Sequence, residues 1–121
     1  MRFGADWDRW EPQFAEAMDQ RLYTPEWLKA TVEGGRAQFW SSDKAAIVSE
    51  LRFYPTGAVD LHGIVAAGDV DEIVGVLIPA AEEWAKKAGC LGAIIESRPA
   101  WRRLLATSGY EPHQLALRKE L

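Results

Sequence analysis

A long amphipathic helix between two apolar segments is the feature that most constrains how this chain can fold. Segment 68–89 opens with a capping pattern, in which Asp69 is followed three residues later by Glu72, and its apolar residues recur with helical spacing. Strands are expected on both sides of it, over residues 58–65 and 91–95. Because a helical crossover joins strands that run in the same direction, these two strands are predicted to lie parallel in one sheet. The predicted buried stripe of the helix comprises Ile73, Val76, Leu77, Ala80, Ala81 and Trp84.

The chain before this unit changes from helical to strand periodicity. Two amphipathic helices are predicted over 6–21 and from Pro25 to a stop at Gly34-Gly35, the second with Thr24 as its N-cap and Trp27, Leu28 and Val32 facing inward. Apolar or alternating runs follow over 36–40 and 45–54, separated by short turns. Together with the strand at 58–65, they predict an antiparallel meander.

The chain after the long helix predicts a short helix and a last strand. Pro99 starts the short helix, and Pro79 is expected to kink the long one, because proline removes a backbone hydrogen bond. Residues 113–121 alternate leucines with polar residues, which indicates a strand. Three residues of the short helix are predicted to face inward: Trp101, Leu104 and Leu105. The expected fold is α/β: one domain over residues 1–121, with a mixed, mostly antiparallel sheet of about five strands and helices on both faces.

Composition excludes several classes of function. The chain has 121 residues, with 14 Lys+Arg and 18 Asp+Glu, and its net charge is −4. This negative charge argues against nucleic-acid binding, because such binding depends on clustered positive charge. One cysteine and two histidines cannot form a Cys/His zinc cluster or an intrachain disulfide, so no metal site is expected. The sequence has no membrane-length apolar run and no signal-peptide pattern. A cytoplasmic domain without membrane partners is therefore expected.

Three side chains are candidates for acid–base chemistry. His62 lies in the third predicted strand and can act as a general base near neutral pH. Glu50 and Glu96 lie on apolar strands and can deprotonate an amine if partly buried. Each also has a structural interpretation: His62 as a packed or surface residue, Glu50 turned outward by strand alternation, and Glu96 at a strand end.

Other reactive or aromatic residues also have two interpretations. Cys90 follows the glycine that ends the long helix and is expected to be a structural thiol rather than a nucleophile. Arg98, Arg102 and Arg103 surround Trp101, either as a phosphate or acidic-partner site or as a solvated helix face whose stems cover the ring. The six tryptophans are expected mainly in the core, although a ligand groove would use the same residues.

The second half of the chain resembles a known family in the order of its motifs. Residues 84–90 (WAKKAGC), 91–96 (LGAIIE), 98–105 (RPAWRRLL) and 108–110 (SGY) are similar to the C-terminal half of the GNAT superfamily of acetyltransferases. The Arg-x-x-Trp-x-Arg spacing before Gly-Tyr looks most like small GNAT-like proteins of phages and prophages. With the preceding meander, the resemblance covers roughly residues 36–121.

The resemblance implies acetyl transfer from acetyl-coenzyme A to an amine, on a small molecule or a protein. Members of the superfamily hold the coenzyme where two parallel strands separate, with its pyrophosphate on backbone N–H groups at the start of the long helix. Carried over to this sequence, the implied cofactor residues are Ile64, Val65, Ala66, Gly68 and Trp101, and the implied base is Glu50, His62 or Glu96.

Two positions depart from the family pattern. The family has an Arg/Gln-x-x-Gly-x-Gly/Ala loop where this sequence has Asp69, Asp71 and Glu72. Each carboxylate that lies about 4 Å from a phosphate adds a repulsion on the order of 4 kcal/mol to coenzyme binding. Leu105 stands where many members have a tyrosine that protonates the leaving thiolate. The chain is therefore interpreted either as an acetyltransferase or as a catalytically silent GNAT-like binding or structural module with a degenerate coenzyme motif.

Overall fold

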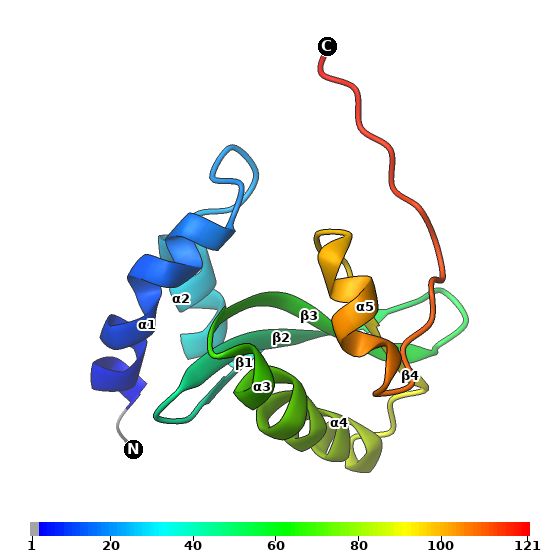
Figure 1. The fold of residues 1–121 in the computed structure, drawn as a ribbon, viewed down its shortest axis with the longest axis horizontal. Coiled ribbons are helices and arrows are strands. Elements are labelled where there is room, and N and C mark those ends of the chain that lie inside the picture. Colours follow the sequence, from blue (N-terminus) through cyan, green and yellow to red (C-terminus); the bar gives the residue numbers. More distant parts are fainter. Residues whose placement is uncertain (1–2) are drawn as a thin grey trace.

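The computed structural model describes residues 3–121 and places four strands of this part of the chain in one mixed sheet (Figure 1). The first two pairings are antiparallel and the last is parallel, as the sequence predicts. The strands lie in the order β1 (Ala37–Ser41), β2 (Ala45–Phe53), β3 (Val59–Gly68) and β4 (Gly92–Ile95). The sheet is thus built from the predicted meander and crossover.

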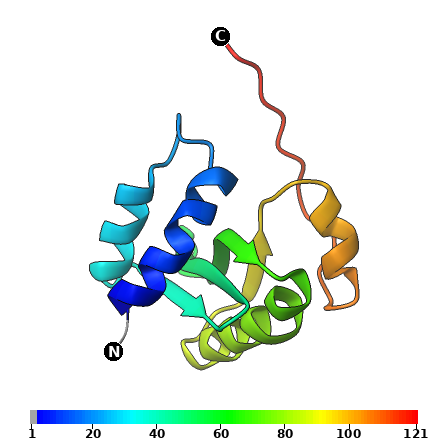
Figure 2. The same ribbon diagram turned by 60° about the vertical axis from the view of Figure 1, so that its left-hand side comes forward.

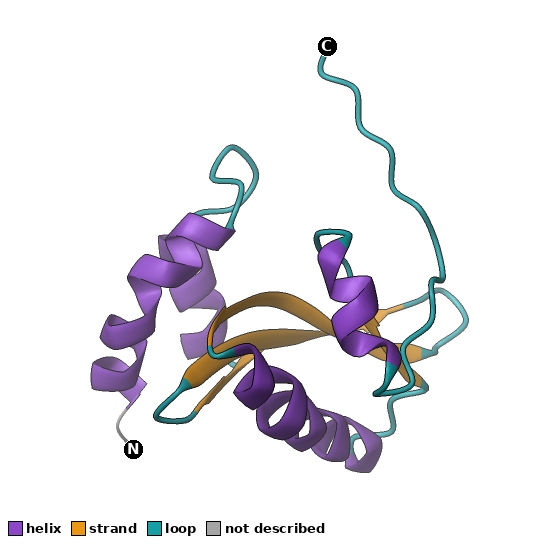
Figure 3. Cartoon of the chain, in the orientation of Figure 1, coloured by secondary structure: helices purple, strands orange, loops and turns teal. Residues whose placement is uncertain are grey.

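Helices cover both faces of this sheet (Figure 3). The first face carries α1 (Phe3–Ala17) and α2 (Pro25–Glu33). The second carries the crossover, which consists of α3 (Val70–Glu72), the π-helical turn η1 (Ile73–Leu77) and α4 (Ile78–Lys87), and also α5 (Ala100–Ala106). The fold class expected from the sequence, an α/β sheet flanked on both faces, is confirmed.

Aromatic side chains of α1 fill the core on the first face. Trp7 and Phe14 are fully buried, and Trp10 is nearly so. They pack against Leu28 of α2 and Val48 of β2, which accounts for two of the six tryptophans as core residues. The prediction that Trp27 faces inward is wrong: 39 % of it is exposed, because Pro25, Leu28 and Thr31 form the buried side of α2.

The crossover helix buries part of the predicted stripe against the second face, but Ala80, which was also predicted to be buried, is exposed. Its buried residues are Ile73, Leu77, Ile78, Ala81 and Ala85, which pack with Ala45, Ile47, Leu61 and Leu105. Val76 departs from the prediction and is half exposed, since it lies in the π-helical turn, where the residues per turn differ from those of an α-helix. Leu104 of α5 is also 39 % exposed rather than buried.

The irregularity of the crossover lies before Pro79, at the π-helical turn. The Ile78 N–H donates to the Ile73 carbonyl, five residues back. Pro79 then occupies the first turn of α4, where a missing N–H and a fixed φ are tolerated. The expected distortion near Pro79 is thus taken up by the turn that precedes it.

Several predicted boundaries shift, and one predicted strand is wrong. The first helix ends at Ala17 rather than at residue 21, and β3 continues to Gly68 because its last residues pair with the start of β2. The strand predicted over 91–95 begins at Gly92, because Leu91 lies exposed before it, and β4 is an edge strand of the sheet described here. Residues 111–121 form no strand: they leave the domain as an exposed extended segment, with no neighbouring strand to pair with (Figure 2).

Gly68 is required where β3 turns into the crossover, and replacing it tests this junction. Its φ is +99°, and an added Cβ would lie 2.4 Å from the Lys44 carbonyl oxygen. We expect Gly68→Ala to lower the free energy of unfolding by about 2 kcal/mol or more, from backbone strain and backbone contact. Urea unfolding measures this change through the shift of the midpoint.

The control for this prediction is Gly75→Ala, because a Cβ there meets nothing within 4 Å. Alanine is favoured over glycine in a helix by roughly 0.5–1 kcal/mol, so this variant should be as stable as the parent or more so. Equal midpoints for the two variants would contradict the role given to Gly68.

Candidate functional site

β3 loses its parallel partner at a bulge in its middle. β3 and β4 pair from Asp60↔Gly92 to Gly63↔Ile95, and the pairing stops there. On the other side, Ser49 pairs with Gly63 and Val48 with Val65, so Ile64 has no opposite residue in β2. Such a bulge bends and twists a strand. The parallel pairing of β3 and β4 therefore ends beside this bulge, where the GNAT resemblance implies that the two strands separate.

Four polar side chains gather on the α1–α2 face of the sheet, just before this separation. His62 Nδ1 lies 2.7 Å from Glu50 Oε2, and His62 Nε2 lies 3.0 Å from Glu96 Oε1. The Arg52 Nη2 atom lies 2.7 Å from Glu96 Oε1 and 3.1 Å from His62 Nε2. The three residues singled out from the sequence thus form one network. Arg52 is a fourth member that sequence reasoning missed, although strand alternation places it on the same face as Glu50.

Both charge states of the imidazole can be satisfied in this network. A neutral ring that carries its proton on Nδ1 donates to Glu50 and accepts from Arg52 at Nε2. A doubly protonated ring donates to Glu50 and, through Nε2, to Glu96. Proton uptake at Nε2 therefore exchanges an arginine partner for a carboxylate partner. A group arranged in this way suits a general base.

Burial and charge differ across the network. The His62 side chain is only 12 % exposed, whereas that of Glu96 is 56 % exposed and opens the network to solvent. The hydrogen bond from Arg52 lowers the pKa of Glu96, against a smaller opposing effect of burial. Glu96 is thereby held as a carboxylate beside Nε2.

The predicted cofactor residues lie at and beyond the strand separation. Ile64 and Val65 pack toward the α1–α2 core, and Ala66 packs toward the crossover helix. Gly68 makes the tight junction described above, and Trp101 of α5 is half-buried against the second core. The fit of Gly68 against the Lys44 carbonyl accounts for this glycine without a ligand.

The start of the crossover helix is capped by one of its own acidic residues, Asp69. Asp69 Oδ1 accepts the Glu72 N–H at 2.9 Å, which confirms the predicted N-cap. Asp71 lies in the same first turn. A helix N-terminus attracts anions through its free N–H groups, and here the Asp69 carboxylate caps it while Asp71 and Glu72 add negative charge in the first turn.

Other candidate residues take structural positions. Burial, with a smaller effect of Asp60, raises the pKa of the Cys90 thiol, which keeps it protonated. Leu105 is a core residue that is 4 % exposed. The Tyr110 hydroxyl donates to Glu82 Oε2 at 2.6 Å, and burial followed by this bond raises its pKa. Arg98, Arg102 and Arg103 are exposed.

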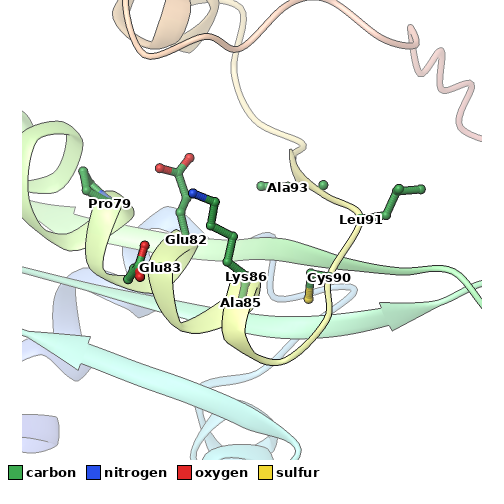
Figure 4. Close-up of a pocket in the computed structure, with 9 residues that line it drawn as sticks. Pro79, Glu82, Glu83, Ala85, Lys86, Cys90, Leu91 and Ala93 are labelled. Atoms are coloured by element: carbon green, nitrogen blue, oxygen red, sulfur yellow. The ribbon is translucent and has the colours of Figure 1, made fainter.

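A groove of about 350 Å³ lies elsewhere, between α4 and the outer side of β4 (Figure 4). It is lined by Pro79, Glu82, Glu83, Ala85, Lys86, Cys90, Leu91, Gly92 and Ala93. No helix described within residues 3–121 is long and apolar enough to cross a bilayer. The same residues contain no group of three or more acidic, His or Cys side chains arranged to hold a metal ion.

Comparison with known proteins finds similarity only at the level of structure. No family model and no curated protein matches the sequence. A GCN5-related N-acetyltransferase from Ralstonia eutropha JMP134 superposes with a TM-score of 0.71 at 15 % identity, covering 98 % of this chain and 92 % of that one. A predicted acetyltransferase with acetyl-CoA from Clostridium acetobutylicum gives 0.70 at 9 % identity, covering 98 % and 90 %.

A third structure is the glucosamine-6-phosphate N-acetyltransferase from Arabidopsis thaliana, with a TM-score of 0.66 at 12 % identity and coverage of 96 % and 92 %. These likenesses span nearly the whole of each chain. The chain therefore has the α/β fold of the GNAT acetyltransferases, in a version whose described part carries a four-stranded mixed sheet.

The Arg52–Glu96 contact predicts that the pKa of Glu96 depends on Arg52. Replacing Arg52 with Gln removes the donor that lowers the Glu96 pKa, so the pKa should rise toward its ordinary value. The side-chain carboxyl carbon shift of Glu96, followed by NMR from acid to neutral pH, reports this change. Arg103→Gln, an exposed arginine of α5, is the control and should leave the titration unchanged. An unaltered Glu96 pKa in Arg52→Gln would rule out the contact.

Proposed function

We propose that this chain is an N-acetyltransferase-type domain of the cytoplasm, which transfers an acetyl group from acetyl-CoA to an amine. The observation that carries the proposal is the Glu50–His62–Glu96 network beside the separation of β3 and β4. The fold supports it, because the structures it superposes on are described as acetyltransferases and one was solved with acetyl-CoA.

The residues of the network supply the base. Neutral His62, oriented by Glu50, takes a proton from the attacking amine at Nε2. Glu96 then accepts a hydrogen bond from the new N–H and balances the positive charge of the ring. Arg52 positions Glu96 and keeps it ionised. A net negative network also suits an acceptor amine that arrives as an ammonium ion.

The arm of acetyl-CoA fits the residues of this chain, whereas its diphosphate does not. Acetyl-CoA supplies an acetyl thioester when bound, on an arm that contains amide groups. The backbone of Ile64, Val65 and Ala66 lies past the end of the β4 pairing, where it can bond such an arm. The carboxylates of Asp69 and its neighbours do not fit a diphosphate at the start of α3. We therefore expect weak coenzyme binding, with Trp101 flanking the acyl-carrier side.

A competing proposal is a catalytically silent GNAT-fold binding or structural module, of the kind carried by phages and prophages. Two observations favour it: the acidic N-cap at Asp69 and the burial of Leu105 in the core, where an acid for the leaving thiolate would stand in the family. In the enzyme proposal, solvent water protonates that thiolate instead.

Titration calorimetry with acetyl-CoA separates the two proposals. We expect a dissociation constant of about 0.1–1 mM for the parent chain. The double variant Asp69→Arg/Glu72→Gly should bind roughly tenfold or more tightly, because it replaces repulsion by attraction at the helix start. The control Glu83→Arg/Glu16→Gly makes the same total change of charge at exposed positions away from α3 and should have little effect.

Absence of binding by the parent at millimolar coenzyme would favour the silent module. Equal affinity of the Asp69→Arg/Glu72→Gly variant and its control would show that the diphosphate lies elsewhere. Circular dichroism checks that loss of the Asp69 cap, which is worth about 1 kcal/mol, leaves the fold intact.

Turnover with a panel of primary amines tests the base. Release of free thiol from acetyl-CoA should fall roughly 10²–10³-fold in kcat/KM for His62→Gln, since general-base catalysis contributes that much. Glu50→Gln should lower kcat/KM less, because the His62 ring keeps the Nε2 atom that accepts the proton. His113→Gln changes the other histidine, which lies exposed in the C-terminal segment, and should be neutral. Full activity of His62→Gln would remove His62 as the base.

A further inference from the structure

The backbone of β1 points alternately toward β2 and toward the outer edge of the sheet. β1 is the first strand of the sheet, and within residues 3–121 it pairs only with β2. The Ser42 N–H donates to the Ala45 carbonyl at 2.9 Å, so the backbone groups of residue 42 point toward β2. Because these groups alternate along an antiparallel strand, those of residues 38 and 40 also point toward β2. The N–H and C=O groups of residues 37, 39 and 41 therefore point outward.

β1 lacks the charge, proline and bulge that usually keep an edge strand from pairing. Its sequence is AQFWS, and its register with β2 runs without a shift from Ala37↔Glu50 to Ser41↔Ala46. An unprotected edge of this kind is a template on which a further strand can pair.

Aromatic side chains flank this edge on both faces of the sheet. A groove of about 260 Å³ lies along it, lined by Phe3 and Val32 on the first face and by Trp84 on the second. Phe39 packs with the α1–α2 core, whereas the Trp40 ring lies 5.8 Å from that of Trp84. A strand placed against β1 would therefore cover apolar groups on both faces.

We propose that β1 of one copy of this chain pairs antiparallel with β1 of a second copy, joining the two sheets across a two-fold axis at Phe39. In this register Phe39 faces Phe39 of the second copy, and Ala37 faces Ser41. These are the residues whose backbone groups point outward, so each pair can exchange both of its N–H···O bonds. A shift of two residues in either direction would leave Ala37 or Ser41 opposite a residue outside β1.

The same register brings aromatic side chains together on both faces. The two Phe39 side chains lie directly opposite each other on the first face. On the second face, Trp40 lies opposite Gln38 of the second copy and diagonal to its Trp40. Aromatic side chains reach across both direct and diagonal positions, and such cross-strand pairs stabilise a sheet.

Charge at the two ends of β1 favours a second copy as the occupant. Arg36 is exposed just before the strand, and Asp43 is exposed just after it. In the two-fold register, Arg36 stands opposite Ser42 of the second copy and beside its Asp43, and the axis repeats this contact at the other end. This inference concerns assembly and is independent of the proposed acetyl transfer.

Light scattering on the full-length chain tests the dimer. At about 100 µM we expect twice the mass of one chain, and dissociation on dilution by mass action. Ser41→Pro removes an outward N–H that β2 does not use, so it should give a folded monomer, with circular dichroism as the check on folding. The control Ser41→Thr keeps this N–H and should remain a dimer.

Charge reversal tests the register. Arg36→Glu turns both end contacts from attraction into repulsion and should weaken the dimer roughly tenfold. Arg36→Glu/Asp43→Arg restores opposite charges and should recover the affinity of the parent chain. A double variant as weak as Arg36→Glu alone would overturn this register.

Amide hydrogen exchange identifies the paired edge. In the dimer the amides of residues 37 and 39 should be protected, and they should lose this protection in Ser41→Pro. The amides of residues 38 and 40 bond to β2 and should stay protected in both proteins. A monomeric parent chain overturns the proposal, as does a dimer that persists in Ser41→Pro or one in which the amides of residues 37 and 39 exchange freely.

Discussion

The pairing of β3 with two different neighbours is the constraint on which the rest of the structure depends. β3 joins β2 antiparallel along its whole length but joins β4 only up to Gly63, because β4 ends at Ile95, next to the bulge at Ile64. The antiparallel side holds the sheet together. The short parallel side sets the point where the two strands separate, and it brings Glu96 to the side of His62.

Electrostatics divides the molecule into two unlike regions. On the α1–α2 face of the sheet, Glu50 contacts Nδ1 of His62, and Glu96 contacts both Nε2 of His62 and Arg52. At the start of α3, Asp69 caps the helix through the Glu72 N–H, so that acid serves local structure. In the proposed acetyl transfer, the network serves the acceptor amine, whereas the acidic start of α3 does not fit a coenzyme diphosphate.

Much of the fold was predictable because local signals agreed with the tertiary arrangement. The Thr24 cap, the Asp69 cap and the periodicity of the crossover each specify an element with few alternatives. Prediction failed where one sequence pattern was compatible with two structures. Trp27 could face in or out on a short helix, and the alternating leucines of 113–121 specify a strand only if a partner edge receives them. Arg52 was missed because its role depends on Glu96, 44 residues away in the chain.

The sequence by itself determined the order of elements, the parallel crossover and the three candidate residues Glu50, His62 and Glu96. Propensity, capping and hydrophobic period act over a few residues, so they can be recognised without coordinates. Only the tertiary structure decided that these three side chains meet, that Arg52 joins them, and that β4 remains an open edge. The reason is that register and the bulge at Ile64 bring distant residues within hydrogen-bond distance, and no local pattern in one strand specifies its neighbour's register.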